Sequence, residues 1–261
     1  MLSIEPLAAF NDNYIWLLAD AEQQRCAVID PGDAGPVLAW LEAHPGWRLE
    51  QIFITHHHAD HVAGCRALQA ASAARIHGPA GERLPVCDQW LHDGDQLTLL
   101  DRPVQVLHVP GHTLGHIALY CPRQDNQPPL LFCGDTLFAS GCGRLFEGSP
   151  AQMLASLKRL ASLDDDCLVY CTHEYTLSNL RFALAVEPSN PHLQVWQERV
   201  TAQRQAGLCS LPSRIDEEKA GNPFLRCLQP EIRQQLEQRA GRTALDEVEL
   251  FATLRAWKDV F

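Results

Sequence analysis

The sequence predicts an α/β part followed by an all-helical part, and two observations support this. Over residues 1–172, short runs rich in β-branched and aromatic residues alternate with turns and a few helical patterns. After His173 the patterns are helical and no convincing strand remains. We therefore predict two domains, residues 1–172 and residues 173–261, of which the second contains only helices.

The expected strands are apolar runs bounded by turn residues. They cover residues 14–19, 25–30, 49–55, 104–109, 117–121, 130–133 and 167–171. The expected helices have apolar residues at helical spacing, and Pro150 suits the first turn of one of them. They cover residues 36–43, 62–71, 150–163, 176–186, 191–205, 230–241 and 244–257.

Composition limits the classes of function. The chain has 261 residues, 46% of them hydrophobic, which is enough for one large core or for a domain with a smaller partner. Its formal net charge is −11, whereas nucleic-acid binders have basic patches and membrane surfaces are negative. We therefore expect no nucleic-acid partner and no membrane association. A monomer is also expected.

The cysteines and the amino terminus indicate a cytoplasmic protein. Ten cysteines are present without any C-x-x-C pair, and disulfide frameworks are typical of short secreted chains. The first residues, MLSIEPLAAFNDNY, contain neither a basic region nor a long apolar run, so no signal peptide is expected. We interpret the cysteines as reduced, buried side chains.

Residues 54–61 read I-T-H-H-H-A-D-H, with four histidines and one aspartate within six positions. Imidazole and carboxylate groups are natural ligands of zinc and similar divalent ions. A solvated histidine-rich turn is the alternative. The pair Asp60–His61 directly after an apolar strand favours a metal site.

Three further segments place a histidine or aspartate directly after an expected strand. They read V-P-G-H-T-L-G-H (109–116), L-F-C-G-D-T (131–136) and Y-C-T-H-E-Y (170–175). Alone, each such residue is more commonly a turn or cap residue. Four such loops in one α/β chain predict a functional site at one edge of a sheet.

These motifs resemble those of a known family. T-H-H-H-A-D-H matches the T-H-x-H-x-D-H signature of the metallo-β-lactamase fold, and later ligand candidates follow in the order of that superfamily. Other segments resemble the glyoxalase II branch, the hydroxyacylglutathione hydrolases. These are N-D-N-Y-I-W (11–16), D-P-G-D (30–33), G-C-G-R-L-F-E-G (141–148), T-H-E-Y-T-L-S-N-L-R-F-A (172–183), N-P-F-L-R (222–226) and L-R-A-W-K-D (254–259).

The resemblance implies a four-layer αββα sandwich, with two β-sheets between helices and the metals at one edge. It implies that one ion is bound by His56, His58 and His112, and a second by Asp60, His61 and His173. By the same resemblance, Asp135 is expected to bridge the two ions, and His57, the variable position of the motif, is expected to point away. The role of His116 stays open. Zinc is the expected metal, with iron or manganese as alternatives.

The implied reaction is hydrolysis of S-(2-hydroxyacyl)glutathione thioesters, such as S-D-lactoylglutathione, by a metal-bridging hydroxide. This is the second step of methylglyoxal detoxification, and Asp60 and Asp135 are its expected catalytic carboxylates. The implied substrate-binding residues are Arg144, Phe146, Tyr175, Arg255 and Lys258. Phe146 stands where many relatives have tyrosine, so a hydroxyl group that could bond glutathione is absent.

Other functions fit the sequence less well. A persulfide dioxygenase of the same fold needs one iron held by two histidines and a carboxylate, fewer ligands than this chain offers. A lactamase lacks the helical carboxyl-terminal part, and an RNA-processing nuclease needs a basic surface. A non-catalytic zinc module favours cysteine ligands in a closed site. For Arg255 and Lys258, a solvated helix end is the alternative role.

Overall fold

The computed structural model describes residues 2–125 and 127–261. Its internal contacts divide the chain into two compact units. Unit 1 consists of Met1–His108 and Gly115–Gly134, and unit 2 of Val109–Leu114 and Asp135–Phe261. In the described part of the chain, no helix is both long enough and apolar enough to cross a membrane.

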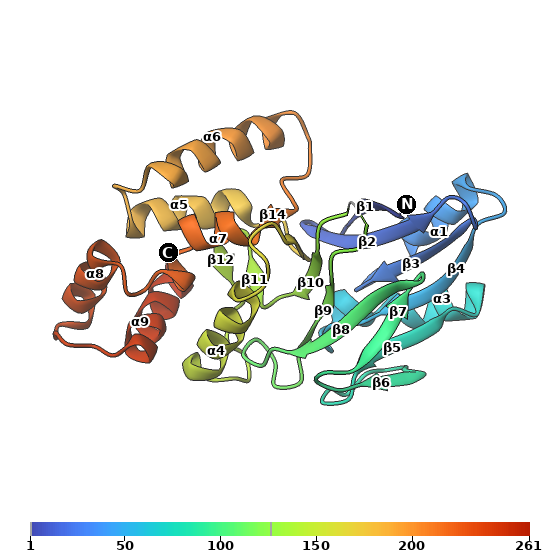
Figure 1. The fold of residues 1–261 in the computed structure, drawn as a ribbon, viewed down its shortest axis with the longest axis horizontal. Coiled ribbons are helices and arrows are strands. Elements are labelled where there is room, and N and C mark those ends of the chain that lie inside the picture. Colours follow the sequence, from blue (N-terminus) through green and yellow to red (C-terminus); the bar gives the residue numbers. More distant parts are fainter. Residues whose placement is uncertain (1, 126) are drawn as a thin grey trace. The chain divides into compact units, whose positions relative to one another are not determined.

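The first sheet of unit 1 has its strands in the order of the chain, as Figure 1 shows. Its strands are β1 (Leu2–Ala9), β2 (Asn13–Asp20), β3 (Arg25–Ile29), β4 (Arg48–Phe53), β5 (Arg75–Pro79) and β6 (Gln89–Leu91). The first three pair antiparallel, whereas β3 to β6 are parallel. The carboxyl ends of β3 and β4 therefore meet at one edge, where ligands bind in such sheets.

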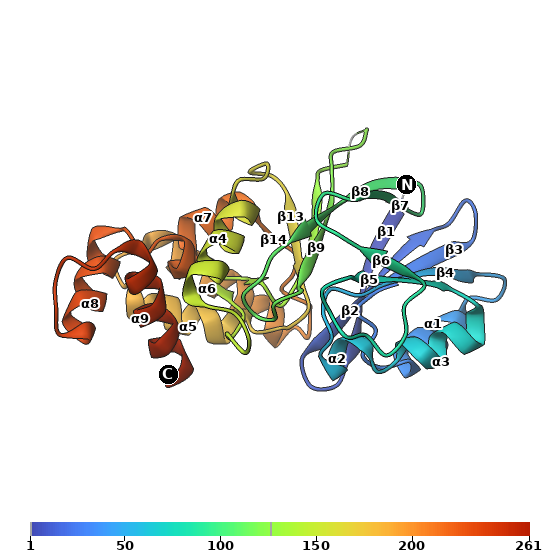
Figure 2. The same ribbon diagram turned by 90° about the horizontal axis from the view of Figure 1, so that it is seen from below.

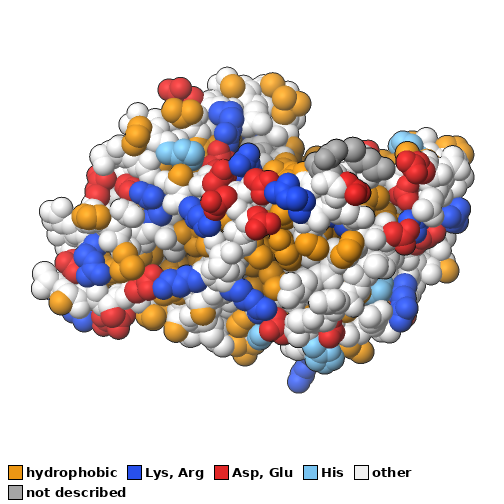
Figure 3. Space-filling view, viewed as in Figure 1, with side chains coloured by type: hydrophobic (Ala, Val, Ile, Leu, Met, Phe, Trp, Pro, Cys, Tyr) orange, Lys and Arg blue, Asp and Glu red, His pale blue; other side chains and the backbone are white. Residues whose placement is uncertain are grey.

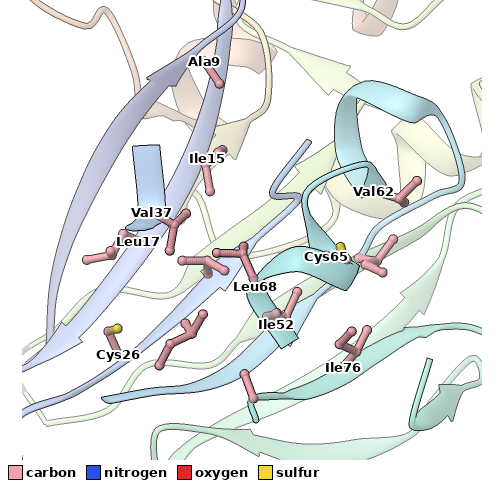
Figure 4. Close-up of a cluster of buried hydrophobic side chains, with 14 of the residues drawn as sticks. Ala9, Ile15, Leu17, Cys26, Val37, Ile52, Val62, Cys65, Leu68 and Ile76 are labelled. Atoms are coloured by element: carbon pink, nitrogen blue, oxygen red, sulfur yellow. The ribbon is translucent and has the colours of Figure 1, made fainter. Parts of the chain in front are cut away.

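Three helices fill the connections between the parallel strands. They are α1 (Gly35–Ala43), α2 (Ala59–Val62) and α3 (Cys65–Ser72). Figure 2 shows α1 and α3 on the same face of this sheet. Val37, Val62 and Leu68 from these helices join strand residues such as Leu17 and Ile52 in one buried cluster, drawn in Figure 4. Burying this apolar face fixes the strand ends that carry the site.

Four antiparallel strands complete unit 1. They are β7 (Gln96–Leu99), β8 (Arg102–His108), β9 (Ile117–Cys121) and β10 (Leu130–Gly134), each paired with the next along the chain. The last strand is entirely buried and ends in Gly134, whose φ of +49° suits glycine. An added Cβ at Gly134 would lie 2.4 Å from the hydroxyl oxygen of Thr55, so this strand end approaches the loop after β4 closely.

Unit 2 contains two small antiparallel pairs and several helices. The pairs are β11 (Leu137–Phe138) with β12 (Gly141–Cys142), and β13 (Leu168–Cys171) with β14 (Ser213–Arg214). The helices are α4 (Pro150–Ala161), α5 (Thr176–Val186), α6 (Pro191–Gln205), α7 (Ile215–Gly221), α8 (Pro230–Ala240) and α9 (Glu247–Asp259), with a 3₁₀ turn at Pro223–Leu225.

Local capping explains where two of these helices begin. Ser149 and Gln152 form a reciprocal capping box at the start of α4, with Pro150 in the first turn. Asp246 and Glu249 form the same arrangement at α9. Each box satisfies backbone N–H groups that a helix leaves unpaired at its start. The start of α4 is therefore readable from the sequence.

The sequence predictions agree with most of these elements, and the differences have local causes. Of the helix expected at residues 62–71, Val62 ends α2 and most of the rest is α3, because the Gly64 backbone N–H between them donates to the Pro31 carbonyl oxygen at 3.0 Å instead of within a helix. The expectation of no strand after His173 is wrong, since β14 pairs with β13. A two-residue strand has no periodicity to detect and forms through its partner.

The surface carries charged side chains of both signs, in agreement with the composition. Lys and Arg side chains are interspersed with Asp and Glu side chains over the face drawn in Figure 3. Many of them form ion pairs within a unit, such as Arg199 with Glu217 and Arg214 with Asp216. Exposed pairs of this kind contribute little to stability, typically about 0–1 kcal/mol each.

Candidate metal centre

Unit 1 places the first group of predicted ligands at the carboxyl ends of β3 and β4. The Thr55 hydroxyl donates to Asp30 at 2.7 Å and contacts His56 Nδ1 at 3.1 Å. Because a hydroxyl has one proton, it accepts from His56 Nδ1–H, which leaves the Nε2 lone pair of His56 available. His56 Nε2 and His58 Nδ1 face each other at 3.0 Å.

Asp30 orients another predicted ligand. Its carboxylate accepts from the Thr55 backbone N–H at 2.7 Å and contacts His61 Nδ1 at 3.0 Å. With Nδ1 facing Asp30, the other ring nitrogen of His61, Nε2, lies 3.6 Å from a carboxylate oxygen of Asp60. A carboxylate behind a histidine is a common means of orienting a metal ligand. Asp30 also adopts a φ of +53°, a strained conformation of the kind found at functional sites.

Two further residues set the position of Asp60. The Asn13 side-chain amide donates to the Asp60 carboxylate at 3.0 Å. Gly32 lies against the Asp60 backbone, and an added Cβ would meet its carbonyl oxygen at 1.9 Å. Any side chain at position 32 would therefore displace the short helix α2 that carries Asp60 and His61.

The two remaining histidines near this loop have different surroundings. His57 Nδ1 bonds the Glu82 carboxylate, whose other oxygen accepts from the Gly115 backbone N–H at 3.0 Å. His116 is fully buried, and its ring stacks on that of His56 with centroids 4.6 Å apart. His116 therefore supports the ring of a predicted ligand from within unit 1.

Unit 2 brings the other predicted ligands together. The Arg144 carbonyl oxygen accepts from His112 Nδ1–H at 2.8 Å, so the Nε2 lone pair of His112 is available. This atom lies 3.4 Å from an Asp135 carboxylate oxygen, and His173 Nε2 lies 3.3 Å from the same oxygen. Two ligand atoms about 2.0–2.1 Å from one tetrahedral ion are about 3.3 Å apart, so this spacing fits a metal site.

The predicted substrate-binding residues lie in unit 2 as well. Tyr175 stacks on the His173 ring at 4.8 Å, and the exposed Phe146 ring meets the His112 ring edge-on at 5.2 Å. Both aromatic side chains therefore border predicted ligands. Phe146 is 61% exposed, so much of its side chain is open to solvent.

Two of the three predicted basic residues contact a carboxylate that is not among the predicted site residues. Arg144 Nε and Arg255 Nη2 both contact the same Asp259 oxygen, at 3.3 Å and 3.2 Å. Arg255 is buried and also donates to the Cys142 carbonyl oxygen at 3.0 Å. Lys258 donates to the Ser178 carbonyl oxygen at 3.4 Å, and burial, with the nearby Arg255 and Arg181 charges, lowers its pKa to about 8.

Sequence reasoning missed the residues that support the ligands. Asp30, Asn13 and Glu82 contact predicted ligands or their loop without being ligand candidates themselves. The first two stand in the segments D-P-G-D and N-D-N-Y, which the sequence analysis used only as family features. Their roles depend on contacts between distant segments.

Cysteine is not needed as a ligand here. Burial raises the pKa of the Cys171 thiol, so its thiolate form is disfavoured. The His and Asp groups described above fit a divalent ion instead.

Comparison with known proteins agrees with this chemistry. The family model described as "Metallo-beta-lactamase superfamily" matches residues 10–173, and the model "Hydroxyacylglutathione hydrolase C-terminus" matches residues 174–261. The domain boundary at residues 172 and 173 stays a prediction. The two matches confirm the predicted fold class, and the family and the His/Asp cluster support a divalent metal site.

Solved structures are similar over much or all of the chain. ETHE1 from Myxococcus xanthus has a TM-score of 0.65 at 24% identity, covering 100% of this chain and 99% of that chain, which shows the fold. TTHA1623 in a di-iron-bound form has a TM-score of 0.52 at 30% identity, covering 65% of this chain and 91% of that chain.

Curated relatives match from end to end. A hydroxyacylglutathione hydrolase of Pseudomonas aeruginosa (strain LESB58) is 57% identical over 261 residues, covering 100% of both chains. One from Pseudomonas putida (strain KT2440) is 54% identical over 263 residues, with the same coverage. The chain therefore belongs to the hydroxyacylglutathione hydrolase (glyoxalase II) family of the metallo-β-lactamase superfamily.

Proposed function

We propose that this enzyme hydrolyses S-(2-hydroxyacyl)glutathione thioesters, converting S-D-lactoylglutathione to D-lactate and glutathione. The observation that carries the proposal is the orientation of the histidines. His56, His61 and His112 each have Nδ1 engaged, so each presents Nε2 to a metal. Full-length relatives named hydroxyacylglutathione hydrolase support the same reaction.

We assign the metal ligands from the family order. One ion is held by His56, His58 and His112, a second by Asp60, His61 and His173, and Asp135 belongs to both. The side chains that contact these residues keep them in place: Asp30 holds His61, Asn13 holds Asp60, and the Arg144 carbonyl oxygen holds His112. Such supporting contacts typically change metal affinity by about 10–100-fold.

The reaction needs a nucleophile and a stabilised oxyanion. Bound divalent ions supply both, since they lower the pKa of water to about 7 and polarise a carbonyl group. The leaving thiol has a pKa of about 8.5, so it departs as a thiolate without a protein acid. The protein therefore has to hold ligands and orient the substrate rather than provide a nucleophilic side chain.

Substrate recognition is assigned to unit 2. Tyr175 and Phe146 border the predicted ligands and offer ring faces and edges to the acyl-glutathione chain. Lys258 is assigned to a glutathione carboxylate, for which it supplies a positive charge. Arg144 and Arg255 contact the Asp259 carboxylate, and a substrate carboxylate would be bound by the same kind of contact. Charge-assisted bonds of this kind contribute about 1.5–3 kcal/mol each.

The metal, the location and the assembly state are further parts of the proposal. We propose zinc as the first metal, with iron and manganese as alternatives; the di-iron form of one relative supports two ions of this kind. We propose the cytoplasm as the location, since all ten cysteines are free thiols. The monomeric state and the lack of a nucleic-acid partner stay predictions.

A direct assay tests the proposal. Purified protein is analysed for bound metal and assayed with S-lactoylglutathione, beside Asp135→Ala and the control His92→Ala, whose side chain is 71% exposed. We expect about two metal ions per chain and hydrolysis by the wild type and the control. Asp135→Ala is expected to lose metal and nearly all activity, and full activity with both metals retained would contradict the binuclear assignment.

A persulfide dioxygenase is the alternative. It would contain one iron and consume oxygen, which the same metal analysis and an oxygen electrode distinguish from hydrolysis.

A further inference from the structure

One short hairpin in unit 2 touches all three predicted ligands of that unit. The Phe138 ring in β11 meets the His173 ring edge-on, with centroids 5.9 Å apart. Gly143, directly after β12, lies so close to Asp135 that an added Cβ would meet its carbonyl oxygen at 1.9 Å. The carbonyl oxygen of the following residue, Arg144, accepts a hydrogen bond from His112 Nδ1. A shift of this hairpin would therefore move every metal ligand of unit 2.

The hairpin makes only a two-residue pairing of its own, and polar side chains from the helices hold its turn. The Ser140 backbone N–H donates to Glu218 Oε2 in α7 at 3.0 Å. The Asn222 amide donates to the Gly141 carbonyl oxygen at 2.9 Å and to the same Glu218 oxygen at 2.9 Å. Asn179 in α5 donates to the Ala139 carbonyl oxygen at 3.1 Å.

Glu218 is the most unusual member of this set. It is 0% exposed, and burial raises its pKa to about 8, although the bonds from Asn222 and Ser140 act in the opposite direction. Its partner Ser140 has a φ of +56°, a conformation that a serine adopts only when its surroundings impose it. A carboxyl group without a counter-charge is costly to bury, so a packing role alone would favour an apolar residue.

We propose that Glu218 is a positioning residue for the metal centre. By accepting from Ser140 and Asn222, it fixes the strained turn of the β11–β12 hairpin. The hairpin then holds His112, Asp135 and His173 in their spacing. This inference rests on the proposed function in one respect only, namely the expected effect of Glu218 on hydrolysis. The helical segment after residue 173 therefore acts on the ligands as well as on substrate binding.

The test compares three variants with the wild type. Glu218→Ala removes the acceptor, whereas Glu218→Gln keeps one carbonyl oxygen for Ser140 and Asn222. Leu236→Ala is the matched control, because it creates a cavity at a fully buried residue of α8, which packs against α5 and α9. For each protein we measure hydrogen exchange of peptides covering residues 137–144 and steady-state kinetics. The metal-free proteins are also titrated with Co²⁺, and binding is followed by absorption spectra.

We expect Glu218→Ala to lose exchange protection in the hairpin and to bind Co²⁺ roughly tenfold or more weakly, with an altered spectrum. Its kcat is expected to fall by a similar factor at nearly constant KM, and Glu218→Gln to restore most of each loss. Leu236→Ala is expected to lower the melting temperature without these changes.

The outcomes separate this inference from the proposed function. A Glu218→Ala protein that resembles Leu236→Ala in exchange, Co²⁺ binding and kcat would overturn the positioning role. If the wild type binds metal but does not hydrolyse S-lactoylglutathione, the proposed function fails, and the exchange and Co²⁺ data still decide on Glu218. A wild type that binds no divalent metal would overturn both.

Discussion

Asp30 shows how much of the metal centre depends on single residues that bind no metal. Its carboxylate accepts from the backbone N–H and the hydroxyl of Thr55, and one of its oxygens lies 3.0 Å from His61 Nδ1. It does so in a left-handed conformation, which aspartate and asparagine tolerate better than most residues. The arrangement determines which nitrogen of His61 carries the proton.

We predict that Asp30→Asn lowers metal affinity by about 10–100-fold. Asparagine keeps the backbone conformation and one acceptor oxygen. Its NH₂ group, however, faces the hydrogen atoms of Thr55 Oγ1 and His61 Nδ1, which favours the tautomer with the proton on Nε2. Zn²⁺ titration measures the effect. Asp33→Asn is the control, because it removes an equal charge from an exposed neighbour, and equal losses in both variants would point to net charge alone.

At the same scale, we predict that Lys258 makes substrate binding pH-dependent. Because burial lowers its pKa to about 8, the ammonium group is charged at pH 7 and becomes neutral as the pH rises through 8. We expect KM for S-lactoylglutathione to rise over this range, toward the roughly tenfold or larger effect of losing a charged hydrogen bond. Lys258→Arg is expected to remove this dependence, since guanidinium stays charged. Parallel KM profiles of the two proteins would contradict the role of Lys258.

At the scale of elements, close contacts between backbone segments fix the positions of the loops that carry predicted ligands. Gly143 follows β12 and leaves no room for a side chain beside the carbonyl oxygen of Asp135. The same is true of Gly32 beside Asp60. In both cases a loop that carries a predicted ligand packs directly on another backbone segment, so the glycine has a steric role.

We predict that Gly143→Ala severely impairs metal binding. The new Cβ would lie 1.9 Å from the Asp135 carbonyl oxygen and 3.1 Å from His112 Nδ1, so the two ligands have to move apart. Metal content and hydrolysis are expected to fall by at least about tenfold. Gly35→Ala is the control, because its Cβ meets only the Asp33 side chain at 3.4 Å or more. Normal metal content in Gly143→Ala would mean that the hairpin tolerates the displacement.

For the whole molecule, Glu218 links stability to pH. Its folded-state pKa is raised from 4.5 to about 8, so its stabilising contribution is complete below pH 4.5 and is lost as the pH rises through 8. Glu218→Gln has no such titration.

We therefore expect the free energy of unfolding of the metal-free wild type to fall relative to Glu218→Gln between pH 6 and pH 9. The difference amounts to about 1–3 kcal/mol, given 1.36 kcal/mol per pKa unit. Urea denaturation of both proteins at the two pH values measures it. A difference that does not change with pH would show that Glu218 is ionised in the folded protein throughout.

The sequence by itself determined the fold class and the family. Local spacing is sufficient for amphipathic helices such as α4 and for apolar strands such as β10, because each pattern is contained within one segment. The motif T-H-H-H-A-D-H and the glyoxalase II segments carried the family, which the full-length relatives confirm. The assignment of individual ligands and substrate residues stays a prediction.

Only the tertiary structure decided which residues support those ligands. Asp30 and His61 are 31 positions apart, and Glu218 is 78 positions from Ser140, so no local pattern connects either pair. The edge strand β1 contains Pro6, which interrupts its pattern, and β14 has only two residues, so both form because a neighbour offers its hydrogen-bonding edge. Periodicity records which face of a segment is buried, whereas contacts between distant segments depend on how the chain packs.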